Sequence, residues 1–281
     1  GDSLKVVEEI GSKLTRLIDG KSLEQDLSMA PWGYTFGTII TTLASLFRAG
    51  RLIVKYNNQE YFSYSDKSVQ EVFTNTTKFK LASFKSLNKS LSSSNKNLLV
   101  QILMDLDYKK HTGQNIDWST NDFELADAIK ILADQFIAEI SAMQSTVDRF
   151  DNLFSQVASL KPILQTHTLK TQESNYIEKV EQFLVQKEEF SDAISKILKA
   201  QKFIKNNFDT VKGFRRFFND VESELKKANR TNIKINDNNE EFDKLFNENM
   251  VKNFAQLQQL AINTKDEYFK MMKDSSALMS T

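Results

Sequence analysis

The sequence has no cysteine and only two histidines among its 281 residues, and these shortages exclude several kinds of chemistry. Without cysteine there is no disulfide, no thiol nucleophile and no thiolate metal ligand. His111 and His167 stand apart in polar stretches, and we expect both on the surface. The sequence also lacks the glycine-rich phosphate loops, dinucleotide fingerprints and nucleophile elbows of large enzyme classes. We therefore expect no catalysis by this chain alone, no cofactor and no small-molecule substrate.

Long apolar runs and an excess of one charge are missing as well. The most apolar stretch, residues 36–47, has about half of the roughly 20 residues that a membrane span needs, so we expect no membrane partner and a cytoplasmic location. Basic and acidic residues number 37 each, which excludes a wholesale basic coat for nucleic acid. Asp105 and Asp107 have no third carboxylate at ligand spacing, so we expect no metal site.

Glycine and proline are unevenly spread, and their distribution predicts two domains. Six of the eight glycines fall at or before Gly50, whereas residues 114–281 hold only Gly213 and Pro162. Few helix breakers over such a length predict long helices, so the fold class is mainly α. The polar, serine-rich residues 86–97 are the best linker candidate. The predicted domains are therefore residues 1–90 and residues 91–281.

The first domain mixes helical and strand periods. Apolar residues at helical spacing predict one helix that ends at Asp19-Gly20 and a second whose apolar face runs from Phe36 to Phe47, closed by Gly50. Residues 51–64 predict a short β-hairpin with its turn at Asn57-Asn58-Gln59. Helices followed by such a two-stranded wing are typical of a winged-helix domain. Residues 67–73 predict one more short helix.

The second domain repeats hydrophobic residues in heptads. Of eleven positions from Tyr176 to Val211 at alternating spacings of four and three, nine are apolar. With two further ladders, this pattern predicts an extended antiparallel bundle with coiled-coil-like heptads. The expected helices lie near residues 95–107, 121–160, 172–228 and 238–275. An unbroken helix over 172–228 would be about 85 Å long against about 60 Å for 121–160, so we expect a break near residues 206–213.

A winged helix raises DNA binding as an alternative function. The predicted outward face of the second helix is rich in threonine: Tyr34, Thr35, Thr38, Thr41, Thr42, Ser45 and Arg48. With Arg48, Arg51 and Lys55 as its candidate DNA contacts and an uncharged wing tip, this surface predicts weak, salt-sensitive binding at best. We favour a protein-facing role for this domain.

A stronger basic patch lies between Lys196 and Arg216, a stretch that holds seven basic residues and one acidic residue, Asp209. The candidate nucleic-acid contacts there are Lys199, Lys202, Arg215 and Arg216. However, residues 173–192 and 237–248 are acidic, and an antiparallel bundle can pair the two kinds of surface. The lysines recur every three residues, so they drift around the helix, and we expect the interleaved phenylalanines in the core.

Two segments of the N-terminal domain resemble a known family: residues 30–34, Ala-Pro-Trp-Gly-Tyr, and residues 43–52, Leu-Ala-Ser-Leu-Phe-Arg-Ala-Gly-Arg-Leu. They are similar to a stretch in the large P-loop ATPases of BREX-type phage-resistance systems, the BrxC/PglY group. There, a Pro-aromatic-Gly-aromatic turn leads into a helix that ends in a Leu-Phe-Arg-Ala-Gly-like run, then a strand. The resemblance covers roughly residues 28–65. This chain departs from the group in having Trp32 before the glycine and Tyr34 after it.

The resemblance implies a region of a multidomain bacterial defence ATPase whose nucleotide-binding loop lies outside this chain. No matching catalytic residue is present, so none is carried over. The implied partners are other protein subunits or the rest of the parent chain, with DNA or phage replication as the eventual target. We interpret the chain as a non-catalytic regulatory or docking region that acts by protein–protein contact. A DNA-binding winged-helix module and a free-standing coiled-coil scaffold remain as alternatives.

Overall fold

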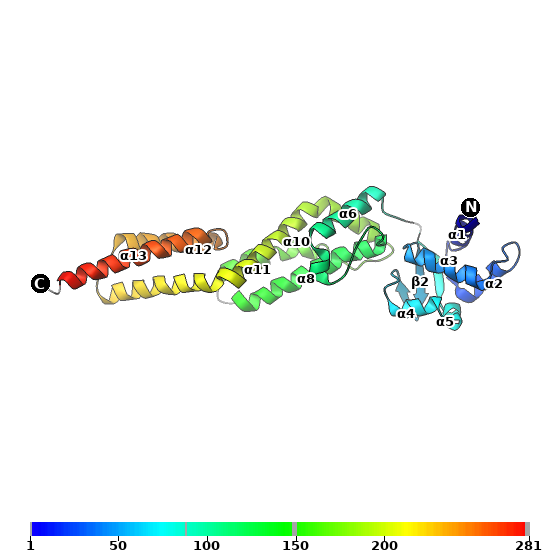
Figure 1. The fold of residues 1–281 in the computed structure, drawn as a ribbon, viewed down its shortest axis with the longest axis horizontal. Helices are drawn as coiled ribbons and strands as arrows, with labels where there is room; N and C mark the ends of the chain where they lie inside the picture. The colour runs from blue at the N-terminus through cyan, green and yellow to red at the C-terminus, as the bar shows by residue number, and fades with distance from the viewer. Residues whose placement is uncertain (1, 88, 148–150, 279–281) are drawn as a thin grey trace. The chain divides into compact units, whose positions relative to one another are not determined.

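The computed structural model describes residues 2–87, 89–147 and 151–278, most of which are helical (Figure 1). The chain forms two compact units. Unit 1 comprises residues 1–135 and 165–188, and unit 2 comprises residues 136–164 and 189–281. Among the described residues, no helix is long and apolar enough to cross a membrane.

The N-terminal part of unit 1 combines short helices with a small antiparallel sheet. Its helices are α1 (Asp2–Lys13), α2 (Gly20–Ser28), α3 (Phe36–Arg48), α4 (Lys67–Gln70), the 3-10 helix η1 (Glu71–Phe73) and α5 (Thr76–Leu81). Its strands are β1 (Ile18–Asp19), β2 (Leu52–Tyr56), β3 (Gln59–Tyr61) and β4 (Ser83–Ser86). The predicted hairpin is confirmed, because β2 pairs with β3 and places Val54 opposite Tyr61. Asn57 and Asn58 both have positive φ, as a tight two-residue hairpin turn requires.

The sheet is larger than the predicted hairpin. Its strand order is β1-β4-β2-β3, and each neighbouring pair is antiparallel. Strands β1 and β4 were not predicted, because β1 has two residues and β4 is mostly polar, Ser-Phe-Lys-Ser, so neither shows a strand period. Phe84 on β4 is fully buried between the strands that flank it and the helices above.

Gly20 begins a helix, so the prediction that Asp19-Gly20 ends one is wrong. Asp19 caps α2, since its Oδ1 accepts a hydrogen bond from the Ser22 N–H at 2.9 Å. The Gly20 N–H donates to the Ala82 carbonyl at 2.8 Å, and a Cβ on Gly20 would lie 2.1 Å from the Phe79 carbonyl oxygen. The glycine is therefore required for close backbone approach, not for helix termination.

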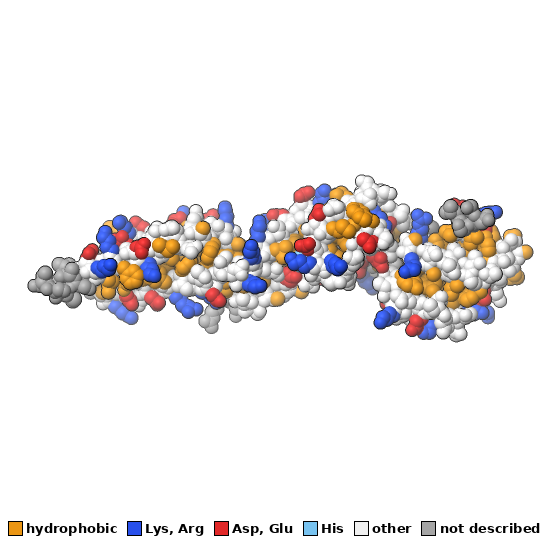
Figure 2. All heavy atoms as spheres, in the orientation of Figure 1, with side chains coloured by type: hydrophobic (Ala, Val, Ile, Leu, Met, Phe, Trp, Pro, Cys, Tyr) orange, Lys and Arg blue, Asp and Glu red, His pale blue; other side chains and the backbone are white. Residues whose placement is uncertain are grey.

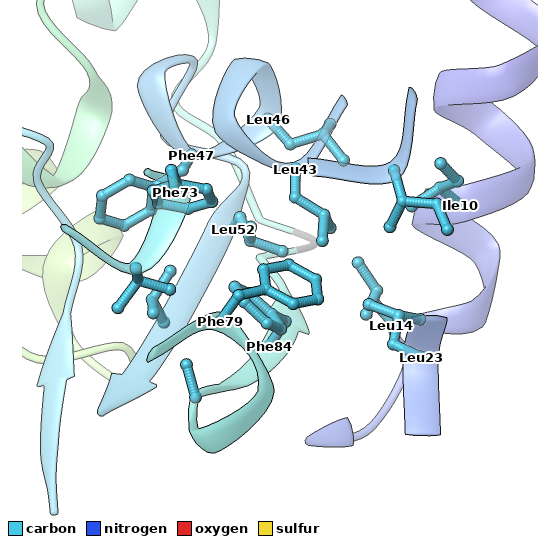
Figure 3. Packing of buried hydrophobic residues seen from close by; sticks show 14 of the residues in the cluster. Ile10, Leu14, Leu23, Leu43, Leu46, Phe47, Leu52, Phe73, Phe79 and Phe84 are labelled. Carbon is cyan, nitrogen blue, oxygen red and sulfur yellow. The ribbon is translucent and has the colours of Figure 1, made fainter. Parts of the chain in front are cut away.

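The core of this part lies between α1, α2, α3, α5 and the sheet (Figure 3). Aromatic rings fill its centre, where Phe79 lies 5.0 Å from Phe84 and Phe47 lies 5.5 Å from Phe73, measured between ring centroids. Each fully buried Leu or Phe side chain stabilises the fold by about 1.5–3 kcal/mol. Gly50 closes α3 with a φ of +69°, as expected.

The rest of unit 1 is helical and contains a buried polar cluster. Its elements are α6 (Ser93–Asp105), α7 (Tyr108–Thr112) and the unit's portions of α8 (Asp122–Val147), α10 (Lys161–Gln165) and α11 (Tyr176–Lys227). Lys179, only 8% exposed, donates to the Leu169 carbonyl at 2.6 Å and to Thr171 Oγ1 at 2.8 Å. Thr171 in turn donates to Asp127 at 2.9 Å, so these contacts tie the loop before α11 to α8.

His167 is buried, so the prediction of a surface position is wrong. Its imidazole is 4% exposed and lies edge-on to the Phe183 ring at 5.4 Å. Burial, and then the charge of Lys179, lower the pKa of His167. The two flanking threonines suggested a solvated loop, but the imidazole packs against the apolar ring of Phe183.

Unit 2 is built from the remainder of α8, α10 and α11 together with α9 (Asp151–Ala158), α12 (Ile233–Asn249) and α13 (Phe254–Leu278). The predicted break near residues 206–213 is wrong, because α11 runs as one helix from Tyr176 to Lys227. Gly213 costs a helix about 1 kcal/mol, whereas Phe208, Val211 and Phe218 are buried around it. Since α11 contributes to both units, no single neighbour has to match its length.

Two other predicted helix bounds are corrected. The single helix expected over residues 238–275 is two helices, α12 and α13, because Asn249 and Asn253 stabilise a turn between them. The expected helix over residues 121–160 appears as α8 and α9, while residues 148–150, with the ladder position Phe150, lie outside the described residues. The helix expected near 95–107 corresponds to α6.

Candidate docking pocket

A pocket of about 750 Å³ lies on unit 2, where α9, α11 and the turn between α12 and α13 meet. From α9 and the residues after it come Leu153, Gln156, Val157, Ser159 and Leu160. From α11 come Lys196, Lys199, Ala200, Lys202, Phe203 and Asn207, and from the turn and α13 come Asn249, Val251, Lys252 and Phe254. The volume is within the range of roughly 300–1,000 Å³ that is usual for ligand pockets.

Local hydrogen bonds hold the walls of the pocket in place. Asn249 Oδ1 accepts from the Lys252 N–H at 2.9 Å, which orders the turn that carries Lys252. Asn253 Nδ2 donates to the Leu245 carbonyl at 3.0 Å and so fixes the start of α13 against α12. Gln156 Nε2 donates to the Glu248 carbonyl at 2.7 Å and joins α9 to the end of α12. The turn and α9 are therefore positioned by asparagine and glutamine side chains.

The floor of the pocket is apolar. Leu153, Val157 and Phe203 are each less than 5% exposed and belong to the hydrophobic interior of the unit. Phe203 and Phe254 meet edge to face, with 5.7 Å between ring centroids, and Phe254 is half-buried. An apolar group that entered the pocket would contact aromatic and aliphatic carbon and lose its hydration, which favours binding.

The rim of the pocket is basic. Lys196, Lys199, Lys202 and Lys252 are exposed, and none of the described residues that line the pocket is acidic. Lys196 pairs with Asp192 one turn earlier at 2.6 Å. Within the described residues, the other three have no carboxylate oxygen within 4.0 Å. Three positive charges around an apolar floor therefore have no partner of opposite sign within the part of the chain that the structure describes.

The position of each lysine follows from its spacing on α11. Residues three apart on a helix lie about 60° apart around the axis, so Lys196, Lys199 and Lys202 stay within one side of α11. Lys205, one step further, is exposed but does not line the pocket. The predicted drift of the lysines is thus real, yet it is slow enough to keep three of them beside one pocket.

The other predicted basic residues of this stretch are not part of the pocket. Arg215 forms an ion pair with Asp243 on α12, and its guanidinium lies 5.7 Å from the ring centroid of Phe246. Arg216 is exposed and does not line the pocket. The expected pairing of the basic stretch with residues 237–248 is confirmed at Arg215. Of the interleaved phenylalanines, Phe203, Phe208 and Phe218 are buried, as expected, while Phe214 and Phe217 are partly buried against the same core.

The structure gives the three basic residues predicted on the N-terminal part different surroundings. The Arg48 guanidinium lies over the Tyr64 ring, 5.0 Å from its centroid. Arg51 lies between α3 and β2, where its carbonyl accepts from Leu87. Lys55 lines a separate polar cleft of unit 1, about 1190 Å³, together with acidic and basic side chains such as Glu60 and Lys85.

The predicted outward face of α3 needs two corrections. Tyr34 is partly buried and packs against the core. Thr42 is only 8% exposed, because it lies three residues after the buried Ile39 and four before the buried Leu46, on the side of α3 that faces the core. Thr35, Thr41 and Ser45 are exposed, and Thr35 caps α3 by accepting from the Thr38 N–H at 3.2 Å. Figure 2 shows acidic, basic and apolar side chains interspersed on the visible face of each unit.

Sequence reasoning found Lys199 and Lys202 but missed Lys252, Phe254 and the α9 residues that complete the pocket. The signal for the turn that carries Lys252 was present: the asparagines at 247, 249 and 253 favour a helix end over a helix interior. Within the described residues, no group of three or more His, Asp or Glu side chains could hold a metal ion. No family model, curated protein or solved structure matches the chain.

Proposed function

We propose that this chain is a helical docking module that acts by protein–protein contact, and that a partner docks at the pocket of unit 2. The observation that carries the proposal is the apolar floor between α9, α11 and α13 with three rim lysines, Lys199, Lys202 and Lys252, that have no carboxylate oxygen within 4.0 Å in the described residues. Protein interfaces concentrate their binding energy in such desolvated pockets surrounded by polar side chains. The pocket walls are ordered by Asn249, Asn253 and Gln156 and are therefore pre-formed.

The wider setting of the proposal is a regulatory or docking region of a multidomain phage-defence ATPase in the bacterial cytoplasm. What supports it is the resemblance over residues 28–65 to the ATPases of BREX-type systems. The partner would then be another subunit or another part of the parent chain. Catalysis is assigned to the parent protein's nucleotide-binding region and not to this chain.

The finer description of the fold belongs to the same proposal. A winged-helix-like N-terminal domain is supported by the order α2, α3 and then the β2–β3 hairpin. A coiled-coil-like bundle is supported by the burial of the heptad positions on α11, of which Val180, Phe183 and Ile197 are fully buried. The DNA-binding alternative has less support, because Asp243 neutralises Arg215 and the hairpin tip at Asn57-Asn58 carries no charge.

Co-purification tests the proposal. The chain would be expressed in bacteria with tagged products of the genes that flank its own, as wild type, as Ser159→Trp and as Ser195→Trp. Ser159 is exposed at the pocket, so an indole there fills its mouth, while the exposed Ser195 on α11 does not line the pocket. We expect one product to co-purify with the wild type and Ser195→Trp but not with Ser159→Trp. Equal recovery with all three chains would contradict docking at this pocket.

A further inference from the structure

We propose that the occupant of the unit 2 pocket is an acidic amphipathic helix of a partner protein. This inference rests on the proposed docking function and specifies the chemistry of the partner. An amphipathic helix presents apolar side chains at spacings of three and four residues on one face and polar side chains on the others. The pocket is complementary to both faces of such a helix. An apolar side chain fits its floor, and negative charge fits its lysine rim.

The floor sets the first requirement. Ala200 and Phe203 on α11 face Val157 on α9 and Phe254 on α13, so carbon surrounds the entering group on several sides. A helix that docks in a groove buries side chains one turn apart. One or two large apolar residues on the partner, such as Leu or Phe, would therefore enter the pocket.

The rim sets the second requirement. Lys199 and Lys202 come from α11 and Lys252 comes from the α12–α13 turn, so two different elements supply the lysines that line the pocket. Carboxylates beside the apolar stripe of a partner helix would meet these lysines. Since each of the three lysines lacks a carboxylate within 4.0 Å in the described part of the chain, a partner's carboxylates would not have to displace an existing pair.

Charge complementarity also argues against a basic or neutral partner. A cationic helix would place like charges beside Lys199, Lys202 and Lys252 at an interface with reduced access of water, where repulsion is costly. Arg215, by contrast, is neutralised by Asp243 and adds no free positive charge beside the pocket. An acidic helix neutralises the three lysines and leaves the apolar stripe free to enter the floor.

Selection from a displayed helix library tests the inference. The probe is a library of helices of about 18 residues, five turns at roughly 3.6 residues per turn, with a fixed leucine stripe and random Glu, Lys or Gln at the flanking positions. It would be selected against the full chain as wild type, Lys199→Glu/Lys202→Glu, Lys205→Glu and Ser159→Trp. Lys205 lies on the same helix outside the pocket and is the matched charge control.

We expect the wild type and Lys205→Glu to enrich glutamate, Lys199→Glu/Lys202→Glu to enrich lysine, and Ser159→Trp to enrich nothing. A selected acidic peptide should bind the wild type at least about tenfold more tightly than the double variant, and more weakly at high salt. Enrichment without a charge preference but lost in Ser159→Trp would overturn the acidic partner and leave docking standing. If Ser159→Trp enriched the same helices as the wild type, or if no chain enriched any helix, both the acidic partner and docking at this pocket would be overturned. Binding of anionic vesicles with the same lysine dependence, without peptide binding, would also overturn the inference.

Discussion

The N-terminal part of unit 1 and the helical unit 2 place some of their basic side chains in different surroundings. In the N-terminal part, Arg48 lies on the Tyr64 ring, and Lys80 is 3.1 Å from a carboxylate oxygen of Glu24. In unit 2, Lys199 and Lys202 surround an apolar pocket without a carboxylate partner in the described residues. Both regions have an excess of basic residues in the sequence. The number of charges therefore says less about binding than the geometry that neutralises some and leaves others available.

The two regions also use glycine differently, and this contrast gives the largest predicted effect. Gly20→Ala would place a Cβ 2.1 Å from the Phe79 carbonyl oxygen, so α2 and α5 would have to separate. We expect a loss of about 3 kcal/mol in the free energy of unfolding of unit 1. Both tryptophans, Trp32 and Trp118, belong to unit 1, so tryptophan fluorescence in urea reports on it alone.

Gly11→Ala is the matched control for that measurement. Gly11 lies within α1, and no atom is within 4 Å of the position where its Cβ would stand. We expect this variant to be as stable as the wild type or slightly more stable. If Gly20→Ala unfolded at the same urea concentration as Gly11→Ala, the close packing of α2 on α5 would be wrong.

The buried Lys179 predicts a dependence of stability on pH that is confined to unit 1. Burial lowers the pKa of Lys179 from its ordinary value of 10.5 to about 8. Between those values the unfolded chain holds a proton that the folded chain has released, so stability should rise with pH from about 8 to 10.5. Below pH 8 lysine is protonated in both states, and its contribution to the slope vanishes.

Lys179→Met removes this titration while keeping a similar side-chain volume. Urea unfolding followed by tryptophan fluorescence at several pH values between 8 and 10 should give a wild-type stability that rises relative to the variant. Comparing the two chains cancels the titration of other groups, including Tyr176, whose pKa burial raises to about 12. Parallel curves for the two chains would show that Lys179 keeps its ordinary pKa in the folded chain.

We expect Gly213→Ala to change the free energy of unfolding less than Gly20→Ala does, and in the opposite direction. Gly213 lies within α11, where φ is helical and no atom is within 4 Å of the place that a Cβ would occupy. Gly213→Ala should therefore stabilise unit 2 by about 0.5–1 kcal/mol. Far-ultraviolet circular dichroism during thermal unfolding measures this gain in stability. Amide hydrogen exchange then assigns the change to α11. A destabilised variant would indicate that α11 bends at this glycine.

The smallest predicted effect concerns DNA and the N-terminal part. Because Arg48 is held on Tyr64 and the hairpin tip at Asn57-Asn58 is uncharged, Arg48→Ala/Arg51→Ala should change duplex DNA binding by less than about twofold. Fluorescence anisotropy of labelled duplex at about 50 and 200 mM salt measures this. Strong salt-sensitive binding that the double variant abolishes would instead make the N-terminal part a DNA reader.

Local patterns predicted much of the helical content, whereas contacts distant in sequence decided what was missed. The heptads located α8 and α11, and Asn57-Asn58 located the hairpin turn. The strands β1 and β4 escaped because their pairing joins residues that are 64 or more positions apart in sequence, Asp19 with Ser83. The prediction of a break in α11 was wrong because it assumed that one neighbouring helix had to match the length of α11, whereas α11 contributes to both units.

The candidate site could be predicted only in part for the same reason. Counting charges located Lys199 and Lys202, which are close in sequence. It could not distinguish them from Arg215, which Asp243 neutralises from another helix. Nor could it place Lys252 beside them, since that depends on the α12–α13 turn folding back on α11.

The central claim is that the lysines around the unit 2 pocket are the ones available to an acidic partner. Competitive acetylation of all lysines, read by mass spectrometry with and without a bound acidic helix, tests it most directly. We expect the helix to protect Lys199, Lys202 and Lys252, and to leave Lys205 and the N-terminal Lys55 as reactive as before. Protection of Lys55, or equal protection of Lys205 and Lys202, would contradict the claim.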